Sequence, residues 1–102
     1  YTDIIVDKLL AFFGRCEPRD AIDLFLILKQ EDFWRLAKLS SQKDPGFDLY
    51  WMAVALEKVA EFPDELNRWP VDMILEVDIG ELKDMFAQIA LRIMDQIKGK
   101  DN

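Results

Sequence analysis

The stretch KLLAFFGRCEPRDAID, residues 8–23, decides the fold, because it contains the end of one predicted helix, a tight connection and the start of a second helix. Gly14 is a natural end for the first helix, which we expect to run from about Thr2 to Phe13. Pro18 suits the first position of the second helix, where its missing N–H costs little. Two helices with such a short connection pack together. The chain is therefore predicted to open with an antiparallel helical hairpin.

Asp23 is the unusual residue of the second helix. It lies in the run from Ala21 to Leu28, in which every other residue is apolar. A helix that is apolar on all sides is normally buried, so we expect Asp23 to be a buried carboxylate that needs a partner. Lys8, on an otherwise apolar side of the first helix, is the predicted partner. Removing Asp23 should then cost about 3–5 kcal/mol, because its cation would be left without a counter-charge.

The hairpin is expected to gather five charged residues on one face: Lys8, Arg15, Arg19, Asp20 and Asp23. The residues alone leave two interpretations open. In the first, the lysine binds a phosphate or a nucleotide, and the final aspartate holds that lysine or acts as a base. In the second, the charges form a structural ion pair that joins two helices. Two aspartates are too few for a metal site, so we assign no metal ligand in this chain.

Three further helices are predicted after the hairpin. Asp32 is expected to cap a helix over residues 33–43, and Asp48 is expected to cap one over residues 49–62. Asp78 begins the last helix with a capping box. Apolar residues then follow the i, i+3, i+4, i+7 spacing of an amphipathic helix, which we expect to end at Gly99. They are Leu82, Met85, Phe86, Ile89, Ala90, Ile93, Met94 and Ile97.

Two weaker features complete the expected fold, which is an all-α bundle of about five helices. Trp34, Trp51 and Trp69 each lie in an apolar segment and are predicted to be core residues. Residues 73–77 read either as a buried connection or as a short strand, although a lone strand has no partner in this chain.

Composition limits the functions that the chain can perform. Its 102 residues suit one domain, residues 1–102. A net charge of −7 argues against broad electrostatic binding to nucleic acid or to an anionic membrane.

With no histidine, a histidine base and a His-containing zinc site are excluded. The single cysteine excludes an intramolecular disulfide, and it fits a reducing compartment such as the cytoplasm. No apolar run has the length of a membrane span.

The pattern K-L-L-A-F-F-G-R-x-x-P-R-D-x-x-D-L-F-x-L, from Lys8 to Leu28, resembles the fourth motif of the AbiEii/AbiGii-type nucleotidyltransferase family. The segment K-D-P-G-F-D, residues 43–48, and the helical tail are also similar to the family. These proteins are the toxin components of bacterial toxin–antitoxin and abortive-infection systems. The resemblance implies that Lys8 and Asp23 line the nucleotide site, and that Arg15, Arg19 and Asp20 support them.

The resemblance also implies an upstream domain that carries a G-S motif and a D-x-D pair for Mg²⁺, and neither motif occurs here. The chain starts at Tyr1 and enters a helix almost at once, so we expect a C-terminal helical fragment of a longer protein. The fragment should complete an NTP site and be inactive alone. The resemblance implies RNA, often tRNA, as an acceptor and a cognate antitoxin as a partner.

A second function remains open on the sequence. The chain would then be a non-catalytic helical protein-interaction domain, and its charged cluster would be only structural. The upstream sequence distinguishes the two, because a G-S followed by a D-x-D supports the enzyme.

Overall fold

The structure, a computed structural model, describes residues 2–63 and 77–100, and every element in them is helical. In chain order the elements are α1 (Thr2–Arg15), α2 (Pro18–Leu28), α3 (Phe33–Lys43), α4 (Leu49–Lys58), the short 3₁₀ helix η1 (Val59–Glu61) and α5 (Ile79–Lys100). The prediction of an all-α bundle of about five helices is confirmed. Of the run considered as a strand, residues 73–76 lie outside the described residues, and Val77 is buried just before α5.

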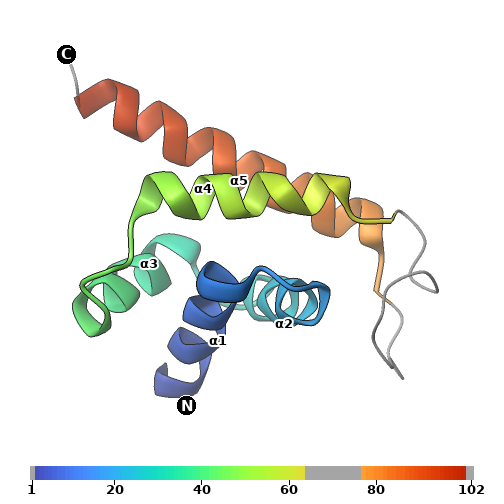
Figure 1. The fold of residues 1–102 in the computed structure, drawn as a ribbon, viewed down its shortest axis with the longest axis horizontal. Helices are drawn as coiled ribbons and strands as arrows, with labels where there is room; N and C mark the ends of the chain where they lie inside the picture. The colour runs from blue at the N-terminus through green and yellow to red at the C-terminus, as the bar shows by residue number, and fades with distance from the viewer. Residues whose placement is uncertain (1, 64–76, 101–102) are drawn as a thin grey trace.

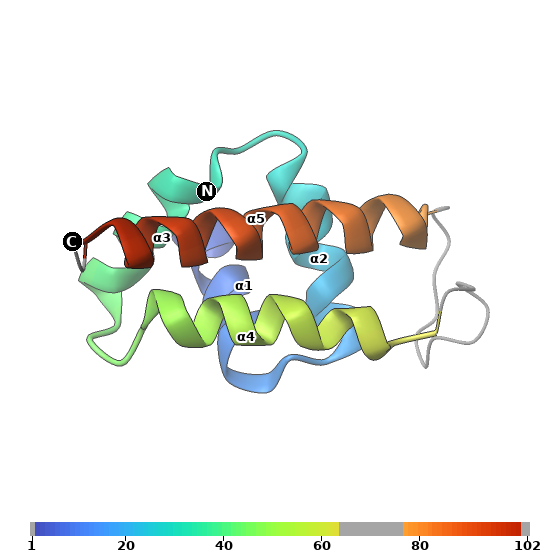
Figure 2. The ribbon, with the colours of Figure 1, turned by 90° about the horizontal axis from the view of Figure 1, so that it is seen from above.

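The helices form two layers. α4 and α5 lie side by side in one layer and run in opposite directions, and α1, α2 and α3 pack beneath them (Figures 1 and 2). Lys83 of α5 donates to the carbonyl oxygens of Ala60 and Phe62, which fixes the start of α5 against the end of the α4–η1 segment.

Three helix starts were predicted correctly from their aspartate caps. Asp32 accepts a hydrogen bond from the Arg35 N–H at 2.9 Å, and Asp48 accepts from Tyr50 N–H at 2.8 Å. Asp78 accepts from the Glu81 N–H at 3.1 Å. Each carboxylate satisfies a backbone donor that the first helical turn leaves free.

Both predicted glycine stops are wrong. Gly14 lies inside α1, which continues to Arg15, and Gly99 lies inside α5, which continues to Lys100. Neither glycine has a positive φ, and the chain leaves α1 through Cys16, whose φ is 51°. Glycine is tolerated near a helix end when another residue takes the left-handed turn. The two additional residues of α1 matter below, because the second of them is Arg15.

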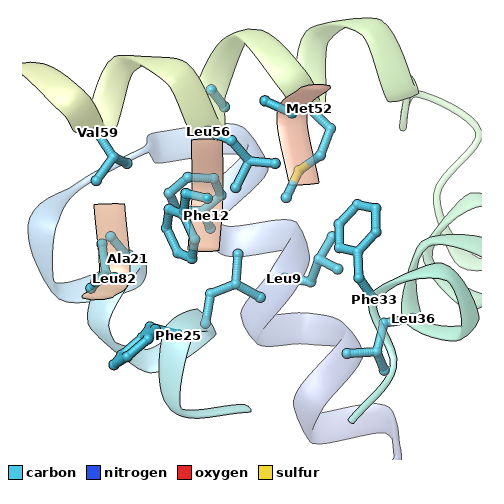
Figure 3. Close-up of a cluster of buried hydrophobic side chains, with 14 of the residues drawn as sticks. Leu9, Phe12, Ala21, Phe25, Phe33, Leu36, Met52, Leu56, Val59 and Leu82 are labelled. Carbon is cyan, nitrogen blue, oxygen red and sulfur yellow. The ribbon is translucent and has the colours of Figure 1, made fainter. Parts of the chain in front are cut away.

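One apolar core joins the two layers. Figure 3 shows side chains from all five helices meeting between them. α5 presents its predicted apolar stripe to this core, with Leu82, Phe86, Ala90 and Ile93 buried. The tryptophan prediction holds only in part: Trp34 packs partly buried against the core, Trp51 is 59% exposed, and Trp69 lies outside the described residues. None of the described helices is long and apolar enough to cross a membrane.

Candidate functional site

Lys8 and Asp23 form the predicted ion pair between α1 and α2. The lysine Nζ lies 3.2 Å from Asp23 Oδ2, and the two side chains are 50% and 35% exposed. The prediction that Asp23 is buried is therefore wrong. α2 turns Ala21, Leu24 and Phe25 to the core, and Asp23 lies on the opposite side of the helix. An exposed pair contributes about 0–1 kcal/mol, so the expected cost of 3–5 kcal/mol for its loss is wrong as well.

The buried acid of the hairpin is Asp20, which is only 4% exposed. Its Oδ1 accepts a 2.7 Å bond from Arg15 Nη2. Its Oδ2 is also buried and has no hydrogen-bond partner among the residues that the structure describes. The burial of Asp20 could not be predicted from the sequence. An acid in the first turn of a helix is normally exposed to solvent, where it interacts favourably with the positive end of the helix dipole.

The two ion pairs share one geometry. Lys8 and Arg15 are seven residues apart, so they stand on the same side of α1, about 10 Å apart along its axis. Their partners on α2, Asp23 and Asp20, are three residues apart. The earlier cation, Lys8, pairs with the later acid, Asp23, as expected for two antiparallel helices. The structure therefore brings four of the five predicted residues together as two pairs. Arg19 is exposed and forms no ion pair with the residues described on either side of the 64–76 gap.

Cys16 forms the turn between the two helices. Its N–H donates to the Phe12 carbonyl at 2.8 Å, which closes α1 in the left-handed conformation that more often takes glycine. Its thiol donates to the Ala55 carbonyl of α4 at 3.3 Å. The turn of the hairpin is thereby attached to the layer above it.

Burial raises the pKa of the Cys16 thiol, Lys58 opposes this rise and Asp20 adds to it. The neutral thiol is therefore favoured in the folded protein, and the thiol is poorly suited to act as a nucleophile. As the pH rises, the Cys16 thiol loses its proton in the unfolded chain before it does so in the folded protein. The folded protein then binds more protons than the unfolded chain, so the free energy of unfolding falls.

Above about pH 8.5 we expect the free energy of unfolding to fall more steeply with pH in the wild type than in Cys16→Ser. The two slopes should differ by at most about 1.4 kcal/mol per pH unit, the value for one proton. Serine keeps a hydroxyl donor and does not titrate in this range, so lysines and tyrosines affect both proteins equally. Urea unfolding between pH 7 and pH 10 measures the difference. Parallel curves would contradict a raised thiol pKa.

A separate open groove of about 900 Å³ lies between α3, the start of α4 and the C-terminal part of α5. Its lining combines aromatic, amide and apolar side chains, among them Trp34, Lys38, Gln42, Tyr50 and Gln96. The adjacent Tyr50 and Trp51 rings are 44% and 59% exposed and pack edge to face, with centroids 5.1 Å apart. Exposed aromatic residues beside a groove are typical of surfaces that bind a partner.

No family model, curated protein or solved structure matches the chain. No group of three or more potential metal ligands gathers within residues 2–63 and 77–100. Asp20 and Asp23 each pair with a cation, so the hairpin does not supply a carboxylate set that fits Mg²⁺.

Proposed function

We propose that this chain is the helical module of a Mg²⁺-dependent nucleotidyltransferase of the AbiEii/AbiGii type and that its α1–α2 hairpin completes the NTP site. The observation that supports this best is the Lys8–Asp23 pair. It joins the two residues that the resemblance assigns to the nucleotide, at 3.2 Å, and both side chains are partly exposed to solvent. A purely structural pair needs no such access, whereas a substrate site does.

The proposed reaction transfers a nucleotidyl group to RNA. A hydroxyl oxygen of the acceptor bonds to the α-phosphorus, the bond from that phosphorus to the bridging oxygen breaks, and pyrophosphate leaves with the electron pair. Asp23 holds the lysine through Oδ2, and its other oxygen accepts the proton of the attacking hydroxyl. Lys8 is then already directed at the phosphate, where preorganised charge lowers the barrier most. The metal would neutralise phosphate charge, and residues of an upstream domain would hold it.

We expect Lys8→Ala in the full-length protein to lower nucleotidyl transfer by on the order of 10²-fold, the scale of losing one directed donor. The fold should be little affected, because the pair is exposed. Steady-state transfer of labelled NTP to RNA, beside a thermal melt, measures both effects. Lys43→Ala is the matched control, because Lys43 pairs with Asp7 at 2.6 Å in another exposed ion pair. Wild-type transfer by Lys8→Ala would assign the pair to packing.

A second function, a non-catalytic helical interaction domain, is favoured by the groove and by the exposed Tyr50 and Trp51 rings. The upstream sequence separates the two functions, because the enzyme needs a G-S motif and a metal-binding D-x-D pair. Under the second function Lys8→Ala leaves every activity unchanged, and Trp51→Ala weakens partner binding.

A further inference from the structure

We propose that the surface between α3 and α5 binds an acidic amphipathic helix of a partner protein. This surface consists of the groove described above and a smaller pocket of about 220 Å³, which adjoins the groove at Trp34, a residue that lines both. We call the two together the α3–α5 surface. Of the α1–α2 hairpin only Leu28 lines it, so the inference does not depend on the proposed nucleotidyl transfer.

The α3–α5 surface has the length of a short helix. Its lining residues on α5 recur at a spacing of three or four, at Met85, Ile89, Arg92 and Gln96. Residues at this spacing lie on one side of a helix, and these four extend over about 16 Å of its axis. A bound helix of about three turns, which has the same length, would therefore contact the whole surface.

The floor of the α3–α5 surface is apolar. Trp34, Met85, Ile89 and Ile97 are only partly buried, because each packs on the core with one side and lines the surface with the other. Covering such side chains removes apolar area from water and is favourable. Apolar grooves between helices bind the apolar stripe of a further helix, whose residues follow the i, i+3, i+4, i+7 spacing.

Two cations without a counter-charge border this floor. Lys38 and Arg92 both line the α3–α5 surface and are exposed, and neither forms an ion pair with residues 2–63 or 77–100. Five other lysines and arginines of the described residues each pair with an acid. Lys38 and Arg92 are therefore available to a partner.

The acids of the same lining are already engaged within the chain. Glu31 pairs with Arg35 at 3.2 Å, and Asp32 caps α3 by accepting from the Arg35 N–H. Asp48 caps α4 in the same way, through the N–H groups of its first turn. The charges left to recognise a partner are positive, so they complement carboxylates that flank the apolar stripe of an acidic helix.

A second copy of this chain fits the α3–α5 surface less well. In a symmetric dimer the same patch of both subunits meets itself, so the free cations would face one another. A basic helix would be repelled by the same two cations. The occupant that the charges favour is an acidic helix of a different protein.

The experiment selects binders to the full-length protein from a displayed library of amphipathic peptides of about 18 residues, long enough to form a helix in water. Every peptide carries leucine along one stripe and a random choice of glutamate or lysine on both flanks. The net charge of −7 favours lysine-rich peptides, so only a local positive site selects glutamate. We expect glutamate-rich peptides to be enriched in physiological salt, where charges more than about 8 Å apart are largely screened.

Lys38→Glu and Arg92→Glu alter exposed side chains, so both variants should melt as the wild type does. Each should weaken binding of the most enriched glutamate-rich peptide about 5-fold, and the double variant about 25-fold, measured by fluorescence anisotropy. The double variant should select lysine-rich peptides. Lys58→Glu is the matched control, because Lys58 is exposed and lies outside the α3–α5 surface. It should keep the wild-type affinity.

The proposal is overturned if no peptide of the library binds, if the wild type enriches lysine as strongly as glutamate, or if the double variant still prefers glutamate. An equal loss of affinity in Lys58→Glu would also overturn it, because the total charge would then decide. Sedimentation velocity tests a second copy as the occupant. A wild-type dimer that excludes the peptide, and that dissociates in the double variant, would assign the surface to self-association and contradict the proposal.

Discussion

Phe12→Ala is expected to lower the free energy of unfolding by about 4 kcal/mol, since it empties the centre of the core. Phe12 is fully buried (Figure 3). Its ring packs edge to face on Phe86 of α5, with centroids 5.6 Å apart. The substitution removes apolar contacts between the two layers and leaves a cavity that rigid helices cannot close. A domain of this kind is stable by only about 5–15 kcal/mol, so the loss is a large share.

Urea unfolding monitored by circular dichroism measures this loss. Phe13→Ala is the control, because Phe13 is only partly buried and its ring packs on Phe47, with centroids 5.0 Å apart. We expect Phe13→Ala to cost clearly less than Phe12→Ala. Equal costs for the two variants would show that Phe12 does not hold the layers together.

Arg15→Met is expected to cost about 3 kcal/mol, the second largest effect on stability. The variant leaves the Asp20 carboxylate buried with no counter-charge on either oxygen. We place the cost at the low end for a broken buried pair, because the arginine side of the pair is 61% exposed. Thermal and urea unfolding of the variant measure it.

The double variant Arg15→Met/Asp20→Leu tests the cause. It removes the stranded charge as well as its partner, so most of the lost stability should return. Arg35→Met, at the Arg35–Glu31 pair whose side chains are 51% and 22% exposed, should change stability by less than about 1 kcal/mol. A double variant as unstable as Arg15→Met would mean that the methionine at position 15, and not the unpaired acid, causes the loss of stability.

The helices could be predicted well because their signals are local. The caps at Asp32, Asp48 and Asp78 and the apolar stripe of α5 each depend on residues within a few turns. The ends at Gly14 and Gly99 were predicted wrongly for the same reason. A glycine permits a helix to stop, but the surrounding packing decides whether it does.

The burial of the hairpin acids could not be predicted, because it depends on how two helices meet. Asp23 stands in an apolar run and is partly exposed, whereas Asp20 precedes that run and is buried. The spacing correctly joined Lys8 to Asp23, because the short connection fixes which residues face each other. It missed the pairing of Arg15 with Asp20, since α1 was expected to end before Arg15. The groove forms where α5 meets α3 and the start of α4, which are distant from α5 in sequence, so no local pattern indicated it.

The direction of α1 governs how a longer polypeptide would be connected. α1 starts on the side of the molecule away from α4 and α5 and rises towards them (Figure 1). A domain joined ahead of Thr2 would therefore leave from beneath the α1–α3 layer, next to the hairpin. Thr2 lies less than two turns from Lys8 on α1, so a short tether ahead of Thr2 would keep whatever it carries close to Lys8 at a high effective concentration.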